Sequence, residues 1–100
     1  MRKIAVAPTF DAEFLEISHY IETRFGTQAA ENFENRFRSI ATTLAHSPLI
    51  GTTAHGYPTE LYGFVMSPSW VFYRYTDAEI IFLHIRDGRR NKAHQSFNGR

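Results

Sequence analysis

WVFYRYTDAEIIFLHIRDGRRNK, residues 70–92, contains two apolar runs joined by a short link and followed by a basic cluster. Residues 70–75 and 80–85 are rich in aromatic and β-branched side chains, which favour strands. The link between them, TDA, is short and compatible with a turn, so the stretch predicts a β-hairpin. Strand alternation places three aliphatic residues of the second run on one side of the strand: Ile81, Leu83 and Ile85. We predict that this side faces the two helices expected from residues 10–44.

Positive charge gathers directly after the predicted hairpin. Residues 84–100 hold five Lys or Arg side chains against one Asp, whereas residues 9–34 hold six Asp or Glu side chains against one Arg. The chain is therefore polarised, with acidic helices and a basic C-terminal end. One interpretation is that the rigid hairpin presents this cluster to a partner. The other is that the cluster is simply a solvated terminus. The candidate target-binding residues of this cluster are Arg86, Arg89, Arg90 and Lys92.

The composition predicts one globular domain over residues 1–100. Apolar residues make up 43% of the chain and aromatic residues 15%, with nine Phe, so a Phe-dominated core is expected. The chain has no Cys, which excludes thiolate nucleophiles and thiolate metal ligands. No apolar run approaches the roughly 20 residues of a membrane span. The N-terminus lacks a signal-peptide pattern, so we expect a cytoplasmic protein.

Two apolar stripes with helical spacing precede the hairpin, one within residues 10–21 and the other within residues 29–44. Their members are Phe10, Phe14, Ile17 and Ile21, then Ala29, Phe33, Phe37, Ile40 and Leu44. Thr9 and Thr27 are the expected N-caps, and Gly26 is expected to end the first helix. Three acidic residues are expected largely off the first stripe: Glu13, Glu16 and Glu22.

The remaining segments supply the other strands. Residues 3–7 form a short apolar strand that Pro8 ends, because proline has no N–H for the ladder. Residues 49–58, with two Gly and one Pro, indicate a loop, and residues 61–66 indicate a further strand. The order β-α-α-β-β-β predicts an α+β fold in which a helical hairpin packs on one face of a mainly antiparallel sheet.

Four short motifs follow one another along this order: SHYIETRFG at 18–26, LAHSP at 44–48, FYR at 72–74 and DGRRN at 87–91. Their order and spacing resemble the ParE branch of the RelE/ParE toxins of bacterial type II toxin–antitoxin modules. The last motif corresponds to the family's usual His-Gly-x-Arg-Asp ending. In relatives, an arginine usually follows the leucine at the start of the third strand. Here Leu61 is followed by Tyr62-Gly63, so the chain departs from the family pattern at this point. Asp87 stands where relatives carry a histidine.

The resemblance implies a toxin that acts by binding a topoisomerase. ParE-type toxins act on DNA gyrase, and their antitoxins are typically ParD-like, with a C-terminal segment that wraps the toxin. The resemblance therefore implies a hetero-oligomer with the antitoxin, no cofactor, no membrane partner and no sequence-specific DNA binding by this chain alone. A family member that has lost toxicity and only binds antitoxin is another alternative.

The enzymatic alternative is a RelE-like ribosome-dependent mRNA endonuclease. Metal-independent RNA cleavage needs a base, an acid and positive charge for the developing oxyanion. Arg89-Arg90 match the basic pair of RelE relatives, and His94 is available as an acid or base. The lysine pair that those relatives hold ahead of the third strand has no match, because residues 49–66 contain no Lys or Arg. A Ser and a Phe stand where those relatives place a tyrosine.

Trp70 and Arg74 in the hairpin each have two interpretations. Trp70 either anchors a partner or covers the core or a sheet edge. Arg74 is either a buried, hydrogen-bonded strut or part of the functional face. No metal site is predicted, because metal-ligand spacing is absent among His19, His46, His55 and His84.

Overall fold

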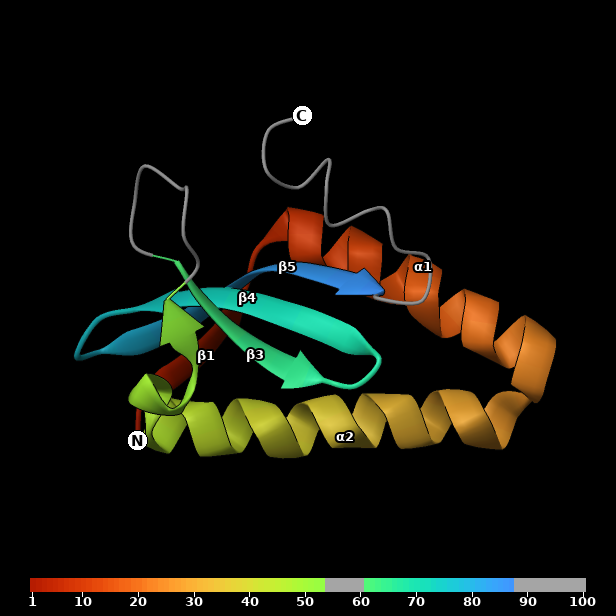
Figure 1. The fold of residues 1–100 in the computed structure, drawn as a ribbon, viewed down its shortest axis with the longest axis horizontal. Coiled ribbons are helices and arrows are strands. Elements are labelled where there is room, and N and C mark those ends of the chain that lie inside the picture. Colours follow the sequence, from red (N-terminus) through yellow and green to blue (C-terminus); the bar gives the residue numbers. More distant parts are fainter. Residues whose placement is uncertain (54–60, 88–100) are drawn as a thin grey trace.

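The structure is a computed structural model that describes residues 1–53 and 61–87, in which two long helices accompany a five-stranded sheet (Figure 1). The elements are β1 (Lys3–Val6), α1 (Pro8–Phe25), α2 (Thr27–His46), the 3-10 helix η1 (Pro48–Ile50), β2 (Thr52–Thr53), β3 (Tyr62–Met66), β4 (Ser69–Tyr75) and β5 (Glu79–Asp87). The strand order is β1-β5-β4-β3-β2, with β1 parallel to β5 and the other neighbours antiparallel. The predicted α+β fold is confirmed, and β2 is a short additional strand in the segment predicted as a loop.

The first helix begins earlier than predicted. β1 ends at Val6, and α1 begins at Pro8 with Ala7 as its N-cap, so the expected Thr9 cap is wrong. Proline is favoured at the first helical position because its φ is already helical and its missing N–H would have no partner there. Pro8 therefore both ends the strand and starts the helix.

Gly26 alone separates the two helices, and its φ of 99° is a conformation that favours glycine. Its N–H donates to the Glu22 carbonyl at 2.9 Å, and its carbonyl accepts from the Ala30 N–H at 3.2 Å. Gly26 thus ends α1 as predicted. It is also the N-cap of α2, so the expected Thr27 cap is wrong.

The core between the helices and the sheet is built largely from phenylalanine rings. Ring centroids lie 4.9 Å apart for Phe14 and Phe33, and 5.0 Å apart for Phe10 and Phe37. The Phe37 ring also meets Phe82 of β5 edge-on at 5.1 Å. Both predicted helical stripes contribute to this core, so the helical hairpin is fixed to the central strands by apolar and aromatic contacts.

A bulge in β5 changes which of its residues face the helices. Phe82 lies opposite Tyr73 of β4, whereas His84 lies opposite Phe72, so Leu83 is an extra residue between the two pairs. Such an extra residue interrupts the two-residue alternation of a strand. Before Leu83, the even-numbered residues of β5 therefore face the helices, and after it the odd-numbered residues do.

The predicted inward face of β5 is consequently wrong in part. Ile80, Phe82 and Ile85 are buried in the core. Ile81 and Leu83 are only half-buried. Ile85 faces the core as predicted, but it does so because the bulge reverses the alternation established by Ile80 and Phe82.

Tyr73 connects the sheet to the segment that follows α2. Its side chain is fully buried, and its Oη donates to the Pro48 carbonyl at 2.5 Å. Gly51 passes so close that a Cβ there would meet the Tyr73 hydroxyl and would lie 2.9 Å from the Gly63 carbonyl. Burial raises the pKa of Tyr73 to about 12.

This raised pKa predicts a loss of stability in alkaline solution. Unfolded tyrosine has a pKa of about 10, so the stabilisation from the neutral phenol is complete below pH 10. This stabilisation is lost as the pH rises from about 10 to 12, because the tyrosine of the unfolded chain releases its proton at a lower pH than that of the folded chain. The free energy of unfolding then falls by about 2–3 kcal/mol. Urea unfolding followed by circular dichroism between pH 9 and 12 tests this. Tyr73→Phe should remove that part of the pH dependence, and an unchanged profile would contradict the assignment.

Candidate interaction surface on the sheet

The face of the sheet turned away from the helices carries aromatic and basic side chains. Along β4, alternate residues enter the core, and the residues between them point to the opposite face. We call this surface the open face, and it comprises Val65, Trp70, Phe72, Arg74, Ile81, His84 and Arg86. Trp70 is 40% exposed and Val65 is 48% exposed, so apolar surface remains accessible there.

Trp70 and Phe72 lie over the backbone of β3. Their ring centroids are 6.1 Å apart with an interplanar angle of 17°. A Cβ at Gly63 would lie 3.3 Å from an atom of each ring, so the missing side chain gives the two rings room to cover the strand. Trp70 thus covers part of the sheet and still presents an exposed flank, and its role as a partner anchor stays a prediction.

Arg74 is exposed on the open face, opposite Ile81 of β5. The interpretation of Arg74 as a buried strut is therefore wrong. It lies four residues along β4 from Trp70, roughly 13 Å away at the usual rise of a strand. Arg86, in contrast, lies directly opposite Trp70 on the neighbouring strand. The structure brings Trp70 and Arg86 together and sets Arg74 apart from them.

Arg86 is held by Glu13 of α1. The β1 pairing reaches only to Phe82 of β5, and beyond that point α1 lies beside β5 (Figure 1). Glu13 Oε2 lies 2.5 Å from Arg86 Nη1, and Glu13 Oε1 accepts the Ile85 N–H at 3.0 Å. His84 Nδ1 lies 3.4 Å from the same Oε2. One carboxylate therefore binds both the side chain and the backbone of this strand, and it fixes Arg86 in place.

The sequence pattern did not indicate that Glu13 is part of this site. Glu16 and Glu22 are exposed as expected, but Glu13 is half-buried. The available signal was its position three residues after Phe10 and four before Ile17, which places it at the border of the apolar stripe. Its partners lie more than 70 residues away along the chain, so no local pattern could identify them.

Removing the charge of Glu13 should destabilise the protein. Glu13→Gln keeps the shape and an acceptor for the Ile85 N–H, but it removes the charge that pairs with the half-buried Arg86. We expect the free energy of unfolding to fall by about 1–2 kcal/mol, the scale of hydrogen bonds to charged groups. Urea denaturation at pH 7 measures this. Glu16→Gln, on the exposed side of the same helix, should change it by less than about 0.5 kcal/mol; equal effects of the two variants would contradict the role of Glu13.

The other predicted binding residues, Arg89, Arg90 and Lys92, lie outside the described residues, as does His94. Within residues 1–53 and 61–87, the structure shows no group of three His, Asp or Glu side chains that could hold a metal ion. Over the same ranges, neither helix combines the length and the apolar character that crossing a membrane requires.

Comparison with known proteins places these features in a family. Residues 4–92 match the family model described as the ParE toxin of the type II toxin-antitoxin system parDE. The fold is similar to a chain of the chromosomal ParDE system from P. aeruginosa, with 15% identity and a TM-score of 0.72 over 87% of this chain and 96% of that chain. A chain of the E. coli DinJ-YafQ toxin-antitoxin complex is also similar, with 13% identity and a TM-score of 0.61 over 90% of this chain and 96% of that chain. No curated protein matches the sequence.

Proposed function

Because the chain belongs to the ParE toxins of type II toxin–antitoxin systems, we propose that it inhibits DNA gyrase by protein–protein binding. We further propose that a ParD-like antitoxin neutralises it by forming a hetero-oligomer with it in the cytoplasm. The observation that supports a binding mechanism is the pairing of exposed Trp70 with Arg86 across two adjacent strands of the open face. Tryptophan and arginine are the residue types that most often dominate the energy of protein interfaces.

The open face is suited to binding because its side chains stand on a rigid support. β4 and β5 are neighbouring strands in the interior of the sheet order, and Glu13 fixes Arg86. A surface that is already ordered loses less conformational entropy when a partner binds. In the sequence, Arg89, Arg90 and Lys92 follow β5 directly, and arginine pairs with carboxylates through two-point contacts. We assign gyrase binding to these basic residues together with Trp70, Arg74 and Arg86.

The charged groups of the open face favour binding over proton transfer. Among the described residues, His84 is the histidine on this face, and its Nδ1 lies 3.4 Å from Glu13 Oε2. That carboxylate already accepts from the Ile85 N–H and pairs with Arg86. Because the structural contacts engage both of its oxygens, Glu13 is poorly placed to act as a general base for a bound RNA.

Parallel assays on the purified chain test this proposal. We expect inhibition of DNA gyrase supercoiling, intact mRNA in a ribosome-dependent cleavage assay, and relief of inhibition when a ParD-like antitoxin is added. Cleavage of mRNA without any effect on gyrase, abolished by His94→Ala, would establish the nuclease alternative instead. Antitoxin binding with neither activity would identify a family member that has lost toxicity.

A further inference from the structure

Arg74 is the arginine of the open face that has no counter-ion within the described chain. Arg86 is paired with Glu13, whereas Arg74 is exposed and forms no hydrogen bond, ion pair or ring contact with any residue that the structure describes. Glu79, two positions before Ile81 on β5, forms no ion pair with Arg74. The positive charge of Arg74 is therefore available to an anionic group of a partner.

The neighbours of Arg74 on the open face are apolar. Ile81 lies directly opposite Arg74 on β5, and Ala5 lies opposite Ile81 on β1. Phe72 precedes Arg74 by two positions, so it is on the same face of β4. A partner that covers these side chains excludes water from the guanidinium, and attraction between opposite charges is stronger where water is excluded.

Trp70 provides a second contact point on the same strand. It is 40% exposed, and Val65, its partner across β3, is 48% exposed. Arg86 lies on the other side of Trp70, where Glu13 already pairs with its charge. The open face therefore presents an apolar point at Trp70 and a cationic point at Arg74, roughly 13 Å apart at the usual rise of a strand.

The spacing of these two points selects the conformation of the partner segment. Alternate side chains of an extended segment point the same way, so two residues four positions apart lie on one side and roughly 13 Å apart. A helix rises by about 1.5 Å per residue and needs about nine residues to cover that distance. Nine residues are two and a half turns, which place the two side chains on opposite sides of the helix. An extended segment therefore reaches both points, whereas a helix does not.

We propose that Arg74 binds a carboxylate of an extended, acidic segment of DNA gyrase, and that an apolar side chain four residues from this carboxylate packs on Trp70. This inference rests on the proposed function, because it describes the segment of the target that the open face contacts. An arginine fork suits a carboxylate because it can bind both oxygens at once. A basic segment would place like charge against Arg74, and an uncharged one would bury the guanidinium without a partner, which is costly.

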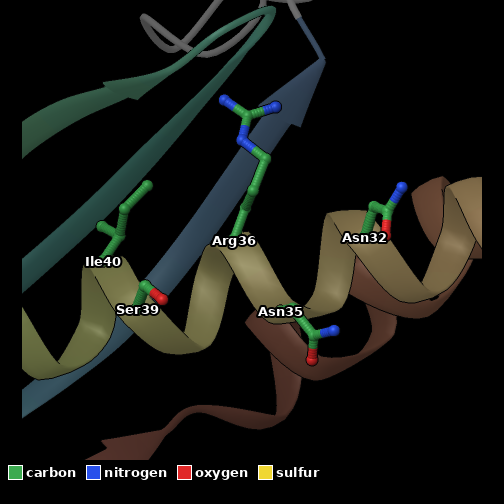
Figure 2. Close-up of a pocket in the computed structure, with 5 residues that line it drawn as sticks. All are labelled: Asn32, Asn35, Arg36, Ser39 and Ile40. Atoms are coloured by element: carbon green, nitrogen blue, oxygen red, sulfur yellow. The ribbon is translucent and has the colours of Figure 1, made fainter.

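Charge reversal at Arg74 tests the cationic contact point. Arg74→Glu should raise the concentration needed for half-maximal inhibition of supercoiling at least about 10-fold, because it replaces attraction by repulsion. The matched control is Arg36→Glu, the same change at an exposed arginine that extends from α2 in the helical layer (Figure 2). It should change that concentration less than about 3-fold, because salt screens charges that lie away from the contact. Thermal unfolding should be nearly unchanged in both variants, because both positions are exposed.

The Arg74→Lys variant identifies the anion, because a carbodiimide joins a lysine amine to a nearby carboxylate through an amide bond. This variant keeps the positive charge, so it should bind DNA-free gyrase more tightly than Arg74→Glu does. Mass spectrometry of the treated complex should show a cross-link that the parent chain lacks, from position 74 to an Asp or Glu of gyrase. An apolar residue should stand four positions from that Asp or Glu. Arg36→Lys should give no such cross-link.

The outcomes separate this inference from the proposed function. Parent-like inhibition by Arg74→Glu, or equal weakening by Arg36→Glu, would overturn the inference alone. Binding of Arg74→Lys to DNA-free gyrase without the cross-link, or a cross-linked segment with no apolar residue at that spacing, would do the same. Weakening by Arg74→Glu only when DNA is present would assign Arg74 to a DNA phosphate and overturn the carboxylate contact. A parent chain that does not inhibit gyrase would refute the proposed function itself.

Discussion

Replacing Phe82 by alanine is expected to lower the free energy of unfolding by about 3–5 kcal/mol, the usual cost of removing a buried phenylalanine ring. Phe82 is 0% exposed. Its ring centroid lies 5.1 Å from that of Phe37, 5.8 Å from that of Phe10 and 5.9 Å from that of Tyr73. The truncation thus opens a cavity where both helices meet the sheet. Because small domains have a stability of about 5–15 kcal/mol, this loss is a large share of the total.

The adjacent residue provides the control for this prediction. Leu83 is half-buried at the bulge, so Leu83→Ala should cost only about 1 kcal/mol, the typical value for a point substitution. Urea denaturation of both variants and the parent, followed by circular dichroism, gives the comparison. A larger loss for Leu83→Ala than for Phe82→Ala would mean that the alternation of β5 is regular and that Leu83 faces the helices.

Removing Arg89 and Arg90 together is expected to weaken gyrase inhibition strongly without unfolding the protein. The loss of one hydrogen-bonded charge contact at a desolvated interface costs on the order of 2–5 kcal/mol. Even the lower figure corresponds to roughly a 30-fold weaker affinity. The concentration of Arg89→Ala/Arg90→Ala needed for half-maximal inhibition of supercoiling should therefore rise by at least that factor. His94→Ala should leave the inhibition nearly unchanged, because a binding mechanism needs no acid or base at that position.

A second double variant separates specific contacts from total charge. Arg24→Ala/Arg38→Ala removes two positive charges from the exposed surface of the helices and should leave gyrase inhibition close to that of the parent. If this control weakens inhibition as much as Arg89→Ala/Arg90→Ala, the effect follows net charge and the assignment of the basic segment to the target contact is wrong. Thermal unfolding of both variants should show that the fold is retained.

Short-range spacing in the sequence determined most of the fold. The helical stripes depend on repeats of three and four residues, which one helical face imposes on neighbouring positions. The stop at Gly26 depends on that residue's own backbone, and the β4–β5 hairpin depends on two apolar runs with a short link. The α+β order followed because these elements can bury their apolar faces in few ways.

The sequence determined the candidate site only in part. It identified Trp70 and Arg86 separately, and their pairing across the sheet appeared only with the register of β4 and β5. It left Arg74 between a buried and an exposed interpretation, because alternation alone does not indicate which face the helices cover. The roles of Arg89, Arg90 and Lys92 remain predictions.

The features that join distant residues appear only in the folded chain. The bulge at Leu83 is defined by how β5 pairs with β4. The alternation of β5 by itself therefore indicated the wrong inward residues, Ile81 and Leu83. Glu13 meets Arg86 across 73 positions of sequence. Sequence periodicity reports how a segment repeats along its own axis, whereas these contacts depend on how separate segments are placed against one another. That placement is set by packing of the whole core, which no local pattern contains.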